Sequence, residues 1–574
     1  MKAHHPSFRK NVLAVAVASL AIWPSLSGAT GPDKGAWLSG DFHQHTYYTD
    51  GSTTFDFVMS KDNEFGLDWW ANSEHGGARA TDGNGNSWNT YSSNPIKGDY
   101  ASTYQVQVSP LTTPPTYKPA LMARWQSLAE YAFPDILQNR ALYPAKRIFS
   151  GLEWNVPGHE HCSTGIVAKD ASAISAFEFQ FDKSDADKSR IGEVTPYGTL
   201  AKTNTTHADA VAGCAWMQKQ YKPQTGEIAK IDNGWIVFAH IERAGAWDPA
   251  SQKGGYNIDN FRDFNNAGPD VCFGFEGAPG HQVNNDRGLG NTVNCTADSV
   301  CTSQDFGGTY GGVGFYSAKV GGLWDALLGE GRRWFNYANS DYHKHYTAGG
   351  DDFYPGEYQR TWVKVEDTNR DRDYSLNEIA NGLRSGNAYF VHGDLINHLE
   401  FTARSRFQQA SMGGELTIKD WRWLREPLVL TIKFKSPTVN NHGDSPVVDH
   451  IDLIAGKITG KVDPASEAYT KATNETTKVI ATFTAADWRT DREDYNVITY
   501  RIRDLDDSMY FRLRGTNLAC VTADETGPAT PLPSADYCKP LADALVTKNQ
   551  GIDGAQEAWN DLWFYSNPIF VYLK

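Results

Sequence analysis

The chain has 574 residues, of which 40% are apolar, 13% aromatic and 21% charged, and its formal net charge at pH 7 is −15. This composition excludes a disordered, collagen-like or coiled-coil chain, and the sequence shows no basic stripe of the kind that binds nucleic acid. Because single cores stop growing near roughly 250–300 residues, the length predicts two domains.

The N-terminal segment has the pattern of a secretory signal. A basic start with Lys2, Arg9 and Lys10 precedes an apolar run over residues 12–22 and the small residues Ser27-Gly28-Ala29. This order predicts a signal peptide over residues 1–29 and a periplasmic or secreted protein. The apolar run is short for a membrane span, which needs about 20 residues, and no later segment is long and apolar enough. A retained N-terminal anchor is the alternative.

Residues 36–395 alternate between short β-rich runs and helical patterns. The runs show little polar alternation, as in parallel strands that are covered on both faces. Strand followed by helix, repeated seven times, predicts a parallel α/β barrel or an open sheet. The expected strands are residues 37–43, 67–73, 147–154, 162–167, 235–240, 271–276 and 334–341, and the expected helices are residues 54–65, 118–138, 207–221, 322–328 and 375–383.

The period of the pattern changes to two after about residue 395. Apolar residues alternate with polar ones over residues 428–435 and again over residues 498–503. Such alternation is typical of half-buried antiparallel strands. We therefore expect an all-β, sandwich-like domain over residues 396–574.

Polar residues cluster where the predicted strands of the first domain end. In an α/β barrel that end of the strands carries the active site. Imidazole and carboxylate side chains suit zinc, manganese or iron, and their number exceeds the needs of one tetrahedral ion, so two or three divalent ions are expected. The candidates are His43, His45, Asp50, His75, Glu153, His161, His240, Asp341 and His343. His159 could replace His161, but His161 lies closer to the strand.

Six of these motifs, in this order, resemble the PHP (polymerase and histidinol phosphatase) family of metallophosphoesterases. They are His43-Gln44-His45-Thr46 with Tyr47-Tyr48-Thr49-Asp50-Gly51, the His75 motif, Gly151-Leu152-Glu153, His161, His240, and Ser340-Asp341-Tyr342-His343. The resemblance spans roughly residues 36–345. It implies a distorted (β/α)7 TIM-like barrel and a trinuclear metal site formed by the nine candidate ligands.

The sequence departs from the family pattern in two places. The second motif, usually Thr-Asp-His, reads Ser73-Glu74-His75, which leaves the role of Glu74 open. The proline that often follows the fifth-strand histidine is Ile241.

A metal-dependent phosphoesterase is the function that these residues predict. Divalent ions would activate a water molecule and bind phosphoryl oxygens, and guanidinium groups would bind the remaining phosphate oxygens. Arg79, after His75, and Arg243, after His240, are the expected catalytic residues. The expected substrate is a small-molecule or polymer-linked phosphate ester, either a monoester or a diester.

Two alternatives to this function remain open at the level of sequence. The same metal site could hydrolyse non-phosphate esters, lactones or amides, in the manner of amidohydrolases. The protein could also be a non-catalytic binding protein in which the C-terminal domain carries the function. His159, His281 and His345 are further candidates for the wall of the pocket.

Overall fold

The computed structural model describes residues 35–105, 118–223, 226–283, 310–406, 408–419, 427–518, 520–521, 539–540 and 554–574. The expected signal peptide lies outside the described residues. None of the described helices is both long and apolar enough to cross a membrane.

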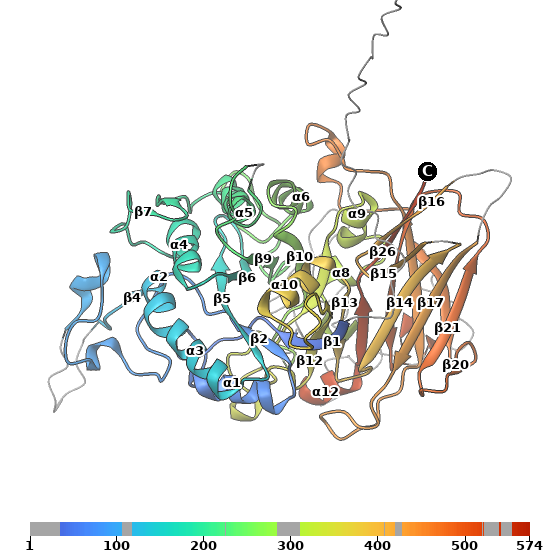
Figure 1. The fold of residues 1–574 in the computed structure, drawn as a ribbon, viewed down its shortest axis with the longest axis horizontal. Helices are drawn as coiled ribbons and strands as arrows, with labels where there is room; N and C mark the ends of the chain where they lie inside the picture. The colour runs from blue at the N-terminus through green and yellow to red at the C-terminus, as the bar shows by residue number, and fades with distance from the viewer. Residues whose placement is uncertain are drawn as a thin grey trace, which may run out of the picture. The chain divides into compact units, whose positions relative to one another are not determined.

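All seven strands expected in the first domain are present and belong to one sheet, so the mixed α/β class is observed (Figure 1). Their interior positions are almost entirely buried, which agrees with the lack of polar alternation in the sequence. The strands are β1 (Gly35–Asp41), β2 (Trp69–Asn72), β5 (Arg147–Asn155), β6 (His161–Val167), β9 (Asn233–Phe238), β10 (Cys272–Ala278) and β11 (Phe335–Ala338).

One of the seven strands runs against the expected direction. Strand β6 pairs antiparallel with both β5 and β9, whereas β1–β2, β2–β5, β9–β10 and β10–β11 pair in parallel. The reason is the short connection over residues 156–160 between β5 and β6. Parallel neighbours need a crossover of about a dozen residues or more, so this connection only permits a hairpin.

The distorted (β/α)7 TIM-like barrel that the resemblance implies is not observed, because the described strands form an open sheet, the alternative that the strand–helix pattern allows. On the side away from β2, strand β1 pairs antiparallel with β12 (Gln359–Glu366) and not with β11. Loop residues still join the two ends of the seven strands. The carboxylate of Asp41 accepts a hydrogen bond from the Ser340 backbone N–H at 2.7 Å, and the His45 N–H donates to the Tyr342 carbonyl at 2.8 Å.

Helices pack against this part of the sheet at the places that the sequence indicates. Helix α5 (His207–Tyr221) has the expected bounds, while the segment expected to be helical over residues 118–138 is divided into α2 (Arg124–Ser127), a π-helical turn (Leu128–Ala132) and α3 (Phe133–Leu142). The other expected helices are α1 (Phe55–Glu64), α9 (Leu323–Gly329) and α10 (Leu376–Ser385). Helices α4 (Ser172–Phe181) and α6 (Ile258–Ala267) were not expected.

Two glycines of the sheet make room for buried tryptophans on the neighbouring strand. A Cβ atom at Gly40 would lie 2.1 Å from the Trp69 ring, and one at Gly165 would lie 2.1 Å from the Trp235 ring. Both rings are at most 1% exposed. These tryptophans therefore contribute to the core rather than to a carbohydrate-binding surface.

The C-terminal part contains two sheets that share one apolar core. Strands β18 (His450–Lys457), β19 (Lys478–Thr484), β22 (Met509–Thr516), β25 (Trp563–Ser566) and β26 (Ile569–Leu573), with β16 (Glu415–Ile418), continue the large sheet from β13 (Ala388–His392). Strands β14 (His398–Ser405), β15 (Gln408–Ser411), β17 (Leu428–Lys435), β20 (Arg489–Thr490) and β21 (Asn496–Ile502) form the second sheet (Figure 1). In β17 buried and half-buried residues alternate, as expected from its period of two.

A buried ion pair connects the helical side to the C-terminal strands. Arg512 on β22 donates two hydrogen bonds to Asp325 on α9, at 2.8 and 2.7 Å, and neither side chain is exposed. The same carboxylate accepts from the Tyr510 hydroxyl at 3.0 Å and from the Gly321 N–H at 2.7 Å. The guanidinium also lies 4.7 Å from the centre of the Trp324 ring.

Replacing one partner of this pair should therefore destabilise the whole protein. Removing one member of a buried ion pair leaves an uncompensated charge and costs about 3–5 kcal/mol. We expect a loss of that size in the free energy of unfolding for Asp325→Ala, measured by urea denaturation. As a control, Asp507→Ala removes the exposed partner of Lys457 and should leave the midpoint nearly unchanged. Equal effects of the two substitutions would contradict the assigned importance of the buried pair.

Candidate metal centre

The nine candidate ligands come from separate segments of the chain and meet at one edge of the sheet. His43 and His45 follow β1, Asp50 lies in the next turn, and His75 follows β2. Glu153 lies within β5, His161 begins β6, and His240 follows β9. Asp341 and His343 follow β11. Because the end of each strand fixes one side chain, the sheet brings residues that are up to 300 positions apart within contact distance.

Four of these residues form the buried floor of the cluster. The Nε2 atom of His43 lies 3.0 Å from Asp341 Oδ1 and 3.3 Å from Glu153 Oε1. The Nε2 atom of His45 lies 3.1 Å from the same Asp341 oxygen and 3.1 Å from Glu153 Oε2. The two imidazoles thus direct the same ring atom towards the same pair of carboxylates.

Glu153 also contacts imidazoles on its other side. His161 Nδ1 lies 2.8 Å from Glu153 Oε1, and His75 Nδ1 lies 2.9 Å from Glu153 Oε2. His240 Nε2 lies 3.3 Å from Glu153 Oε1 and 3.1 Å from Asp341 Oδ2. A carboxylate that several imidazoles approach from different sides is placed to bridge more than one cation.

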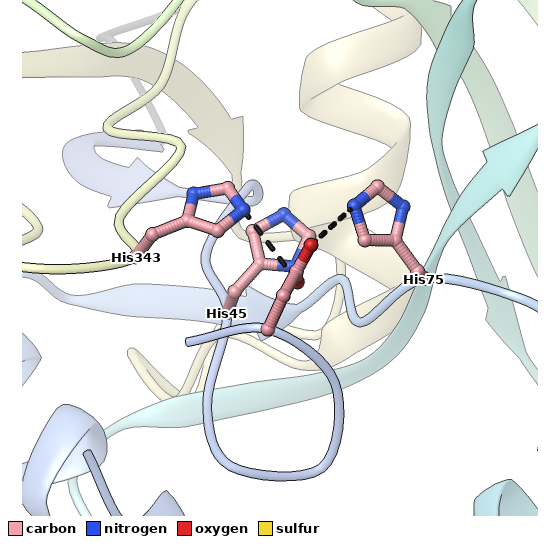
Figure 2. Close-up of side chains that lie close together, drawn as sticks. His45, His75 and His343 are labelled. Atoms are coloured by element: carbon pink, nitrogen blue, oxygen red, sulfur yellow. Dashed lines mark ion pairs between the residues drawn. The ribbon is translucent and has the colours of Figure 1, made fainter. Parts of the chain in front are cut away.

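Asp50 is the centre of a third group. His75 Nε2 lies 3.2 Å from Asp50 Oδ2, and His45 Nδ1 and His343 Nε2 lie 3.5 and 3.6 Å from Asp50 Oδ1. Figure 2 shows His45, His75 and His343 with their rings close together. His45 and His75 therefore belong to two groups each, one on Glu153 and one on Asp50.

The polar atoms of the floor fit metal ions. Seven buried ligand atoms make no hydrogen bond within the described part of the chain: His43 Nε2, His45 Nε2, His75 Nδ1, both oxygens of Glu153 and both oxygens of Asp341. Unpaired buried acceptors are costly, and shared cations would satisfy all of these atoms together. Nitrogen and oxygen donors without a thiolate suit zinc, manganese or iron. The donor set is therefore compatible with a multinuclear metal site.

The charges of the cluster shift the pKa values of its members in opposite directions. Burial lowers the pKa of His45, but Asp341 and Glu153 outweigh it and raise that pKa to about 9. Burial dominates at His161 and lowers its pKa to about 4. Burial alone would raise the pKa of Glu153 and Asp341, but the surrounding imidazoles hold both pKa values well below their ordinary range. Both carboxylates are consequently ionised and available to bind cations.

The candidate ligands differ in their exposure to solvent. His43 and His45 are completely buried, whereas the side chains of Asp50, His343 and His161 are 41%, 24% and 17% exposed. The cluster therefore combines a buried part with members that solvent reaches.

The two predicted catalytic arginines lie in different surroundings. Arg243 Nη2 donates to Glu160 at 2.9 Å and lies 3.1 Å from His161 Nδ1, so it borders the cluster. Arg79 lies on β3 (Ala78–Arg79), makes no contact with the cluster that the structure describes, and has a buried Nε without a hydrogen-bond partner among the described residues.

His159 and His345, two of the further pocket candidates, point away from the cluster. His159 Nδ1 donates to the Gly255 carbonyl at 2.8 Å, and its Nε2 lies 2.8 Å from His207 Nδ1. His345 Nε2 lies 3.0 Å from Glu357. His161, rather than His159, is the histidine of that segment that lies against Glu153.

Sequence reasoning missed the carboxylates that orient the ligands. Glu276, at the end of β10, lies 2.9 Å from His43 Nδ1. Because a carboxylate accepts, Nδ1 carries the proton and the Nε2 lone pair faces the cluster, as in many metal sites. The position of Glu276 at a strand end was a visible signal, but its partner lies 233 residues away.

Glu74, whose role the sequence left open, stabilises the loop that carries His45 and Asp50. It is completely buried, accepts hydrogen bonds from the hydroxyls of Thr46 and Thr49, and accepts one from the Thr46 N–H at 3.2 Å. Glu74 thus fixes the loop from both sides without facing the metal ligands itself.

The sequence matches no protein-family model and no curated protein sequence. Among solved structures, the chain is similar to a two-domain protein from Bacteroides vulgatus ATCC 8482 that contains a predicted PHP-like metal-dependent phosphoesterase. The two chains share 12% identity over 87% of this chain and 96% of the other, with a TM-score of 0.30. This likeness is too distant to assign the chain to a family.

Removing bound metal should lower the thermal stability of the protein, because Glu153 and Asp341 would lose their counter-charges. A ligand present at 100 times its Kd stabilises the folded state by about 2.7 kcal/mol. We expect the Tm of purified protein to fall on chelation and to recover when zinc, manganese or iron(II) is added. A Tm that is insensitive to both treatments, together with metal analysis that finds no bound ion, would contradict the metal centre.

Substitution of Glu74 should weaken metal binding without removing a ligand. In Glu74→Ala the hydroxyls of Thr46 and Thr49 lose their acceptor, so the loop with His45 and Asp50 becomes looser. Loss of such a supporting partner typically costs 10–100-fold in metal affinity, and we expect a decrease of about that size in competition with a chromophoric chelator. Glu64→Ala, in an exposed ion pair on α1, is the control and should bind metal like the wild type.

Proposed function

We propose that the protein is a metal-dependent hydrolase of phosphoric esters. The observation that carries this proposal is the set of buried imidazole and carboxylate atoms that face one another without hydrogen-bond partners. Two or three divalent ions, of zinc, manganese or iron, account for these atoms. The order of the motifs along the chain, similar to that of PHP metallophosphoesterases, adds support from the sequence.

The residues of the chain prepare the site in several ways. Divalent ions bound here would lower the pKa of water towards neutrality and offset the charge of phosphoryl oxygens. Glu153 and Asp341 hold the positive charge in a buried position, and Glu276 orients His43 towards it. No nucleophilic side chain is required for hydrolysis by such a site.

Arginine provides the feature that favours a phosphate over an uncharged ester. A guanidinium offers several N–H donors in one plane, which match phosphate oxygens. Arg243 lies at the edge of the cluster beside His161, on the exposed side. It uses Nη2 to contact Glu160, and no other nitrogen of its guanidinium has a hydrogen bond or ion pair within the described chain. We therefore propose that Arg243 binds a phosphoryl oxygen and that Arg79 contributes a second positive charge.

The substrate class proposed is a small-molecule or polymer-linked phosphate ester. The net charge of −15 repels anionic substrates in general, so the metal ions and the arginines would have to provide the local attraction. Export to the periplasm or the medium, as the N-terminal segment indicates, is part of the proposal. A division into a catalytic part over residues 36–395 and a β-rich part over residues 396–574 is also retained as a proposal.

Purified full-length protein should hydrolyse aryl phosphates in a metal-dependent manner. We expect activity on a monoester or a diester that chelation abolishes and metal restores. Arg243→Ala should lower kcat/KM by roughly ten- to hundredfold, because a hydrogen bond to a charged group contributes about 1.5–3 kcal/mol. Arg489→Ala, on the exposed strand β20, is the matched control and should keep wild-type activity.

Two results would contradict this function. Hydrolysis of aryl acetates, lactones or amides with no turnover of phosphates would indicate an amidohydrolase-like enzyme. Bound metal without turnover of either class would favour a binding protein.

A further inference from the structure

A tenth side chain, His281, lies against the metal cluster. Its Nε2 atom is 2.9 Å from Asp341 Oδ2, the oxygen that His240 Nε2 approaches at 3.1 Å. The rings of His240 and His281 are stacked with their centres 6.1 Å apart, and the His343 ring lies 5.6 Å from the His281 ring. His281 therefore occupies the same kind of position towards Asp341 as the candidate ligand His240.

The backbone is shaped to place His281 there. Gly280 passes so close to the β11 loop that a Cβ atom would lie 2.1 Å from the Ser340 carbonyl oxygen. His281 itself adopts a φ of 60°, which is unfavourable for a residue with a side chain. His240 and Asp341 also have positive φ values, of 50° and 45°. Strained backbone of this kind persists where the surrounding structure requires it, and it clusters at functional sites.

Asp352 determines which nitrogen of His281 faces the cluster. Asp352 is completely buried, and its Oδ1 lies 2.8 Å from His281 Nδ1. Its Oδ2 accepts hydrogen bonds from the backbone N–H groups of His343, at 2.8 Å, and Lys344, at 3.1 Å. The carboxylate is thereby fixed and accepts the Nδ1 proton. In the neutral imidazole the lone pair of Nε2 is then directed at Asp341 Oδ2, which is itself an acceptor.

The same arrangement occurs on the other side of Asp341. Glu276 accepts from His43 Nδ1 at 2.9 Å, and His43 Nε2 faces Asp341 Oδ1 at 3.0 Å. Two carboxylate–imidazole pairs, Glu276–His43 and Asp352–His281, thus approach the two oxygens of one buried carboxylate. In each pair the imidazole Nε2 lies 2.9–3.0 Å from an oxygen of Asp341, close enough for one cation to contact both atoms.

We infer that His281 is a further metal-binding residue of the centre, with Asp352 as the residue that orients it. Its Nε2 completes a group with Asp341 and His343, whose ligand atoms lie within 4.8 Å of one another. This inference rests on the proposed metal-dependent function, but it concerns a residue outside the nine that the sequence indicates. The experiment that tests it measures metal binding rather than turnover.

The test compares His281→Gly with the wild type, both as full-length protein loaded with cobalt(II). Glycine tolerates the positive φ at this position, so the substitution relieves strain while it removes the imidazole. We expect at least one equivalent of cobalt to be lost or bound about tenfold or more weakly, which is the lower end of the range for weakened metal sites. The visible absorption of bound cobalt should change, and added imidazole should restore both properties. His281→Gln, which keeps a side chain of similar length, should show the same loss.

The controls separate this inference from the proposed function. Asp352→Asn should reproduce part of the loss, whereas His345→Gln, whose ring contacts Glu357 instead of the cluster, should bind cobalt like the wild type. Wild-type stoichiometry, affinity and spectrum in His281→Gly would overturn the role of His281 while leaving the metal centre in place. A wild type that binds no metal would overturn both.

Discussion

The structure depends on the burial of two carboxylates, Glu153 and Asp341, in the middle of a set of imidazoles. A buried ionised carboxylate is costly unless it is paired, and here imidazole nitrogens approach the oxygens of both groups at 2.8–3.3 Å. The imidazoles around them are oriented by other groups, such as Glu276 behind His43. Shared metal ions would satisfy the carboxylates and the imidazole lone pairs simultaneously. The positions of the strand ends, of the oriented rings and of the strained loops all follow from this one requirement.

Assembly of the cluster requires unfavourable backbone conformations. Nine non-glycine residues of the described chain have a positive φ. Three of them lie together, because His240 and His281 both approach Oδ2 of Asp341, the third. Such conformations cost of order 1–3 kcal/mol each. Hydrogen bonds between strands do not stabilise these residues, because the ends of the seven strands meet through loops. Side-chain hydrogen bonds take the place of strand pairing here: Asp41 accepts one from the loop after β11, and Asp352 accepts one from the His343 backbone N–H. Asp41 is completely buried at this junction, and this burial raises its pKa to about 7.

Much of the fold and of the candidate site could be predicted because both depend on local patterns. The seven strands are continuous apolar runs, and a polar residue at the end of such a run reveals a strand end, which is how His43, His240 and Asp341 could be found. The direction of β6 could have been predicted as well, because only five residues separate it from β5. The open edge could not be predicted in this way, since the pairing of β1 with β12 in place of β11 depends on contacts over more than 300 positions. The orienting roles of Glu276 and Asp352 could not be assigned either, because each is defined by the ring that the carboxylate contacts, 233 and 71 positions away.

The members of the cluster differ in their exposure to solvent, and this difference bears on the proposed chemistry. The floor, where His43 and His45 contact Glu153 and Asp341, is closed to solvent, so cations held there would interact strongly with their ligands in a low local dielectric. Asp50, His343 and His161 are partly exposed, and His161 lies beside Arg243. An anionic substrate of the kind proposed would meet the guanidinium and the more exposed members of the cluster together. The ends of the strands thus bring completely buried candidate ligands and partly exposed ones into one cluster, and the hydrolysis proposed above, by a metal-activated water, would use both kinds.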